Sequence, residues 1–190
     1  ATSFASEIAP DLVPPSERAL FMYATPRHYI GTILAGENSV KELHILAGTR
    51  AQRLNARGIY LPAQNDAGLA AAAWATEMTA LEAAAEAMAD RQIGWADFDA
   101  MLVEMDAELT RIADFFGFNT DCVSEVSSGP LMSRYSKAME YEYSANLRHE
   151  LIAEAAERYA ADIDSALAML RSAADKSPLL ARALRRSEEN

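Results

Sequence analysis

The chain has 190 residues, of which 51% are hydrophobic and 24% are charged, a composition typical of one globular domain and not of a disordered segment. Its 28 acidic residues outnumber its 17 Lys and Arg residues, and the formal net charge is −11. Such a charge argues against binding to nucleic acid or to an anionic membrane surface, because both reward a basic protein surface.

The first residues predict a helix, a strand and a turn. Residues 1–13 have a helical pattern, and because the chain starts with Ala1 inside that pattern, we expect a truncated N-terminus. Residues 19–24 form an apolar run of strand length between Arg18 and Pro26. This strand is expected to lead through a proline turn into a helix.

Two longer helices are expected next. Ser39 and Glu42 form a capping box, which predicts a helix over residues 39–57. Asp66 is expected to cap a second helix over residues 66–90. The predicted apolar stripe of this helix consists of Trp74, Met78, Leu81, Ala85 and Met88.

A second strand is predicted at residues 92–96, which are again short and apolar. Nearly continuous apolar strands favour a parallel sheet that is covered on both faces. Because two strands do not make a stable sheet alone, we expect upstream strands or a partner to complete it. The predicted fold class is therefore α/β and mainly helical, with a small parallel sheet flanked by helices.

The rest of this single predicted domain is helical apart from one long loop. A helix over residues 106–116 is expected to stop at Gly117, and residues 119–143 lack periodicity. Ser144 predicts the cap of a final long helix, followed by a polar tail over residues 173–190. The core-facing residues of that helix are expected to be Leu147, Leu151, Ala155, Tyr159, Ile163, Leu167 and Leu170.

The exit of the first strand is the first candidate site. Ligands of open α/β sheets bind beyond the carboxyl ends of strands, where a helix start offers free N–H groups to an anion. Arg27 lies in the first turn of this helix and can grip a phosphate, and Thr32 can add a hydroxyl. The alternative is an ordinary strand-to-helix turn with a solvated arginine.

Other residues suggest acid–base chemistry. His28 could act as a hydrogen-bond donor or a base. Glu77 lies on an apolar stripe, where burial would raise the pKa of its carboxyl group and make it a base, although pairing with a nearby cation is the alternative. Asp97 and Asp99 are expected to cap a helix start, and paired carboxylates can also do acid–base work.

A second candidate site lies in residues 127–137. Arg134, Lys137 and neighbouring serine hydroxyls lie close to Gly129, a combination suited to holding phosphate or sulfate. A serine-rich surface loop with incidental charges is the alternative.

Compartment and metal content follow from the cysteine and histidine residues. Cys122 is the only cysteine, so no internal disulfide can form and a reducing, cytoplasmic location is expected. No apolar run approaches the ~20 residues that a membrane-spanning helix needs, and no signal peptide is visible. Cys122 and the histidines have no metal-ligand spacing, so we expect no metal and a soluble protein without membrane partners.

The strand and turn over residues 19–32, the segment 91–118 and the loop 134–137 together resemble the C-terminal portion of bacterial sulfotransferases. Those enzymes use 3′-phosphoadenosine 5′-phosphosulfate as sulfate donor. The strand, the Pro26–Arg27 turn and Thr32 resemble the 3′-phosphate site of that family. Thr32 falls where the family has a serine, whereas Ala24 falls where it has an arginine.

Two further segments carry the resemblance. The strand and acidic turn of residues 91–102, with the helix that ends in Phe116-Gly117-Phe118, are similar to the terminal elements of the family. The run Arg134-Tyr135-Ser136-Lys137 resembles a loop before the last helix of the family. The resemblance implies that Arg134, Ser136 and Lys137 close over the donor nucleotide.

The resemblance implies a partial P-loop-like fold and transfer of a sulfuryl group to a hydroxyl or amine of a small-molecule acceptor. The sequence lacks the glycine-rich donor loop of the family, so this fragment is expected to be inactive without upstream sequence. A non-catalytic helical interaction module or nucleotide-binding module is the alternative function. The sequence leaves a homo-oligomer open.

Overall fold

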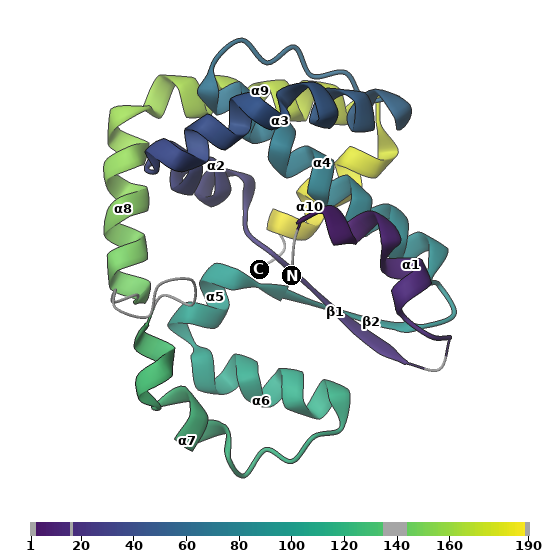
Figure 1. Cartoon of the computed structure of the whole chain (residues 1–190), viewed down its shortest axis with the longest axis vertical. Coiled ribbons are helices and arrows are strands. Elements are labelled where there is room, and N and C mark those ends of the chain that lie inside the picture. Colours follow the sequence, from purple (N-terminus) through teal and green to yellow (C-terminus); the bar gives the residue numbers. More distant parts are fainter. Residues whose placement is uncertain (1–2, 16, 135–143, 189–190) are drawn as a thin grey trace.

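The computed structural model describes residues 3–15, 17–134 and 144–188. Figure 1 shows helices packed above a two-stranded sheet, with α8 descending along one side toward α5, α6 and α7. The elements are η1 (Ser3–Ile8), α1 (Ala9–Leu12), β1 (Arg18–Tyr23), α2 (Pro26–Leu34), α3 (Glu37–Ala56), α4 (Asp66–Ala87), β2 (Gln92–Asp97), α5 (Phe98–Val103), α6 (Met105–Phe116), α7 (Val123–Ser127), η2 (Pro130–Ser133), α8 (Ala145–Arg158), α9 (Ala160–Ala174) and α10 (Pro178–Glu188).

The sheet consists of β1 and β2, which pair in parallel from Arg18 opposite Gln92 to Tyr23 opposite Asp97. The prediction of two short parallel strands flanked by helices is therefore confirmed. Trp95 packs edge-to-face on the ring of Phe21 with 5.2 Å between the centroids. Such aromatic pairs stabilise the sheet beyond simple burial of apolar area.

Helix α4 is the central helix of the domain. It packs against α2, α3, α9, α10 and η1, so that apolar residues are buried on more than one side. Its sequence predicts one apolar stripe, but the run from Ala70 to Ala73 shows that the helix is surrounded instead. Alanine permits this because its small side chain lets neighbouring helices approach from several directions. The indole Nε1 of Trp74 donates to the carbonyl of Ala24 at 2.9 Å and so fixes the exit of β1 on α4.

Helix starts differ from the predicted caps by a few residues. Helix α3 begins after Gly36 without a side-chain cap, so the capping box expected from Ser39 is wrong. Asn65, and not Asp66, caps α4, because its Oδ1 accepts from the backbone N–H of Gly68 at 2.8 Å. Gly117 ends α6 as predicted, with a φ angle of 74°.

The C-terminal region forms three helices where one was expected. Ser144 caps α8 as predicted and accepts from the N–H of Leu147 at 3.1 Å, but the helix ends before Tyr159 and α9 follows in a new direction. The break changes which residues face the core, so Leu147 and Leu151 are exposed. The spacing of apolar residues in the sequence continues without a break, whereas in the structure α8 and α9 each have a buried face of their own.

The segment expected as a polar tail contains α10. Its apolar residues Leu180, Ala183 and Leu184 are buried against α4 and α9, because their spacing places them on one face. Arg186 of the same helix pairs with the buried carboxylate of Glu82 in α4, and its guanidinium lies 3.9 Å from the ring centroid of Trp95 in β2. The helix is thus fixed to both α4 and the sheet.

The close packing around α4 predicts the effect of a larger side chain. Ala73 is fully buried, so Ala73→Leu is expected to lower the free energy of unfolding by about 1–3 kcal/mol through overpacking. Urea unfolding followed by circular dichroism measures this loss. Ala87→Leu, an exposed position at the end of the same helix, is the matched control. Equal stability of the two variants would contradict the central position of α4.

Candidate functional site

The carboxyl ends of both strands lie side by side, and a helix starts after each. Thr25 caps α2 by accepting from the N–H of His28 at 3.3 Å. Asp97 caps α5 by accepting from the N–H groups of Asp99 at 2.7 Å and Ala100 at 3.2 Å, as the sequence predicted. These caps place His28 and Asp99 in the first turns of neighbouring helices.

Asp99 joins three elements at this edge of the sheet. Its Oδ2 lies 3.0 Å from Nδ1 of His28 in α2, and its Oδ1 accepts from Nε of Arg148 in α8. The Arg148 guanidinium also lies 5.0 Å from the ring centroid of Phe98. The side chains are 17% exposed for Asp99, 10% for Arg148 and 42% for His28. We refer to these three residues as the strand-edge cluster.

The pKa values in the strand-edge cluster reflect its contacts. Burial raises the pKa of Asp99, but the hydrogen bonds from His28 and Arg148 outweigh it, and the pKa is lowered. The hydrogen bond to Asp99 raises the pKa of His28, against the opposing effects of burial and of the Arg148 charge. A raised pKa keeps the imidazole protonated to a higher pH than that of an ordinary histidine.

The arrangement suits proton transfer beside an anion. Asp99 holds Nδ1 of His28, and none of the described residues hydrogen-bonds Nε2. A carboxylate that orients a histidine in this way fixes its tautomer. When His28 is protonated, two cations flank the Asp99 carboxylate, and the Asp97 carboxylate also acts on His28, so the local charges balance.

Arg27 and Thr32 have other partners in the structure. Nη2 of Arg27 pairs with Oδ1 of Asp164 in α9 at 2.6 Å. The Thr32 hydroxyl donates to the carbonyl of His28 at 2.7 Å, a bond within the same helix. The structure therefore does not join the two side chains around one anion position. Both remain on α2, the helix that also carries His28.

The remaining predicted site residues lie apart from the cluster or outside the described residues. Glu77 pairs with Arg53 at 2.8 Å and accepts from the hydroxyl of Ser6 at 2.9 Å, which matches the paired alternative. Arg134 is exposed at the end of a described segment. Ser136 and Lys137 lie outside the described residues.

Arg148 is the member of the cluster that the sequence analysis missed. No motif contains it, and arginine is common on the exposed faces of helices. The buried residues of α8 are Arg148, Ile152 and Ala155, whose spacing follows one helical face. A charged residue on an otherwise apolar face was the available signal, because a buried charge requires a partner.

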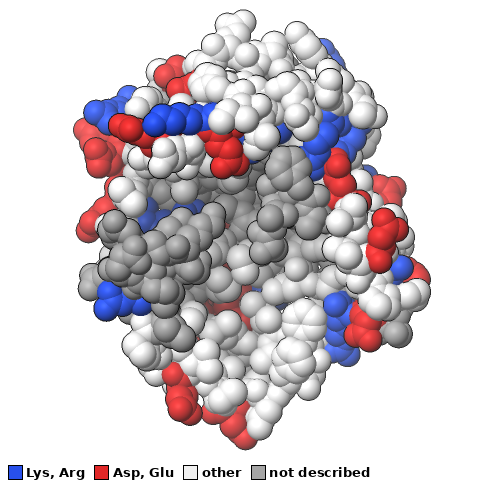
Figure 2. Space-filling view, viewed as in Figure 1, with Lys and Arg blue, Asp and Glu red and all other residues white. Residues whose placement is uncertain are grey.

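Charges elsewhere on the surface are mixed. In the view of Figure 2, acidic and basic side chains of the described residues lie next to one another around the margin of the face. In the described part of the chain, no group of three or more His, Cys, Asp or Glu residues is arranged to hold a metal ion. No helix within the same residues has the length and apolar character needed to cross a membrane.

Comparisons with known proteins identify no relative. The chain matches no protein-family model, and no curated protein or solved structure is significantly similar to it. The site must therefore be interpreted from its own residues.

The contacts of the cluster predict how His28 titrates. Asp99→Asn removes the charge and the acceptor that raise the pKa of His28, so this pKa is expected to fall. NMR titration of the imidazole signals measures it, with the exposed His149 as a reference signal. A His28 pKa that stays the same in the variant would show that the pair does not form in solution.

Stability should depend on pH through the same pair. Because the folded-state pKa of His28 is raised, the contribution of His28 to the free energy of unfolding is fully present below the ordinary histidine pKa of about 6.5. It is lost as the pH rises through the raised folded-state pKa. Urea unfolding at a series of pH values should show this loss in the wild type, and His28→Gln should remove it. An identical pH dependence in both proteins would contradict the linkage.

Proposed function

We propose that the strand-edge cluster belongs to the nucleotide-binding part of a sulfotransferase-like protein. Its donor would be 3′-phosphoadenosine 5′-phosphosulfate, and its acceptor a hydroxyl or amine of a small molecule in the cytoplasm. The donor would supply the sulfuryl group. Because this sequence contains no glycine-rich donor loop like that of the family, the chain is expected to bind the nucleotide without turnover.

The observation that carries the proposal is the position of Asp99. The sequence resemblance rests on three separated segments: the strand and turn before α2, the second strand with its acidic turn, and the loop before α8. Asp99 contributes from the second segment, His28 from the first, and Arg148 from the helix that follows the third. One carboxylate thus joins the first two segments, and the helix that follows the third, at the edge where α/β proteins bind ligands.

The residues at this edge fit an anionic nucleotide. The Arg27–Asp164 pair is exposed, with side chains 48% and 65% exposed, and such pairs contribute only about 0–1 kcal/mol. A phosphate can therefore compete with Asp164 for Arg27. By the resemblance, Arg134, Ser136 and Lys137 would cover the nucleotide from the loop before α8.

His28 is the candidate for proton transfer within this function. Its Nε2 would accept the proton that the acceptor hydroxyl or amine loses, while Asp99 stabilises the charge that forms on the ring. Arg148 would hold Asp99 in place and is therefore a positioning residue.

Binding of adenosine 3′,5′-bisphosphate tests the proposal. Isothermal titration calorimetry should detect binding to the wild type, and Arg27→Gln should weaken it by roughly 10–100-fold, the loss of a charge-assisted hydrogen bond. Arg27 is exposed, so this variant should fold normally.

Arg171→Gln, an equivalent change at an exposed position of α9, is the matched control and should keep the wild-type affinity. Adenosine without phosphates should bind much more weakly. No binding by the wild type, or equal affinities of the two variants, would reject this function and favour a helical interaction module.

A further inference from the structure

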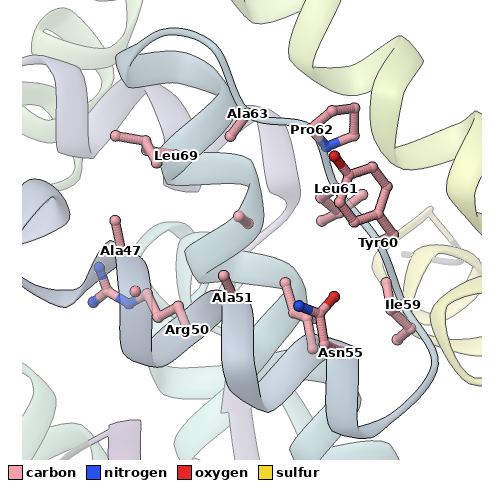
Figure 3. A pocket seen from close by; sticks show the side chains of 13 residues that line it. Ala47, Arg50, Ala51, Asn55, Ile59, Tyr60, Leu61, Pro62, Ala63 and Leu69 are labelled. Carbon is pink, nitrogen blue, oxygen red and sulfur yellow. The ribbon is translucent and has the colours of Figure 1, made fainter.

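A separate pocket of about 380 Å³ lies between α3, the segment 59–63 and the first half of α4. Figure 3 shows Ala47, Arg50 and Ala51 on one side of it and the segment from Ile59 to Ala63 on the other. It shares no lining residue with the strand-edge cluster. Pockets for small molecules commonly have volumes of ~300–1,000 Å³ and mainly apolar walls with a few polar groups. This pocket fits that description.

Arg50 is the charged residue of the pocket. It is only 5% exposed, and its Nε and Nη1 atoms are buried without a hydrogen-bond partner among the described residues. The one ion pair that it makes there joins Nη2 to Oε1 of Glu42 at 3.7 Å, and the Glu42 side chain is 66% exposed. This distance is too long for a hydrogen bond.

Arg53 in α3 and Arg57 directly after it both have partners for their charges. Arg53 binds both Glu7 and Glu77, each at 2.8 Å. Arg57 pairs with Glu7 and donates to the carbonyl of Thr76 at 3.2 Å. Arg50 lies on the same helix, is buried more deeply and has no such partner. A guanidinium stays charged in a protein, so its burial is costly unless an anion accompanies it.

We propose that this pocket binds a small organic carboxylate with an apolar body. The carboxylate would accept hydrogen bonds from the Arg50 guanidinium, and the body would lie on Ala51, Leu61 and Leu69. A monoanion balances the single charge of Arg50, whereas a phosphate dianion would leave one negative charge unbalanced between mainly apolar walls.

The wall of the pocket next to Arg50 consists of small residues, Ala47, Gly48 and Ala51. The Nε and Nη1 atoms of Arg50 are buried in the structure, so in this proposal the Arg50 side chain rotates to bring these N–H groups to the ligand.

Hexanoate is the probe for this site, with 1-hexanol and inorganic phosphate as comparison ligands. In two-dimensional NMR titrations, hexanoate should saturate and shift the amide signals of residues 59–61 and of α3. Its affinity should exceed that of either comparison ligand by at least about tenfold, because only hexanoate has both the charge and the apolar body. Absence of saturable binding, or equal affinity for 1-hexanol, would overturn the proposal.

Two variants separate binding from folding. Arg50→Met should weaken hexanoate binding by at least about tenfold and leave the protein as stable as the wild type or more stable, because an unpaired buried charge is replaced by an apolar chain of similar length. Ala51→Phe should fill the pocket and abolish binding, and Ala56→Phe, at an exposed position of the same helix outside the pocket, should not. A strong loss of stability in Arg50→Met would show that the arginine has a structural role alone. Hexanoate binding that persists in Ala51→Phe would show that the ligand does not occupy this pocket, and either result would overturn the proposal.

Discussion

The burial of α4 on several sides is the constraint on which the rest of the structure depends. Alanine fills most of its first half, and these small side chains let α2, α3, α9 and α10 pack around one helix. The largest residue in this stretch, Trp74, donates a hydrogen bond to the carbonyl of Ala24. The core helix thereby holds the exit of β1, and with it the start of α2, in a fixed position.

The strand-edge cluster follows from that position. Parallel pairing brings the ends of β1 and β2 together, and caps at Thr25 and Asp97 start a helix immediately after each strand. Two short turns therefore place His28 beside Asp99. Helix α8 then adds Arg148 from a distant part of the sequence, and the carboxylate is shielded from solvent between two donors.

The features that the sequence predicted well are local ones. Strand positions follow from apolar runs of a few residues, and the ends of helices at Gly117 and Ser144 depend on one residue and its immediate neighbours. The same applies to Asp97, whose capping role requires only the next turn of chain. Such features involve contacts between residues close in sequence, so the local sequence pattern is sufficient to predict them.

What the sequence could not predict depends on contacts between distant segments. Whether Arg27 binds a phosphate or Asp164 depends on where α9 lies. The role of Arg148 depends on Asp99, which is 49 residues away. The helix over Pro178–Glu188 mixes apolar residues with three arginines, and its apolar residues are recognisable as a core face only when α4 and α9 are in place. Ser136 and Lys137 lie outside the described residues, so their part in the proposed site stays a prediction.

Chemical-shift mapping of adenosine 3′,5′-bisphosphate on the backbone amides tests the central claim most directly. Our account predicts that amides in three separate segments, 25–32, 97–100 and 144–148, shift together and follow one saturation curve, because they surround one nucleotide site. Shifts confined to one of these segments, or located elsewhere, would contradict a site assembled at the ends of the two strands.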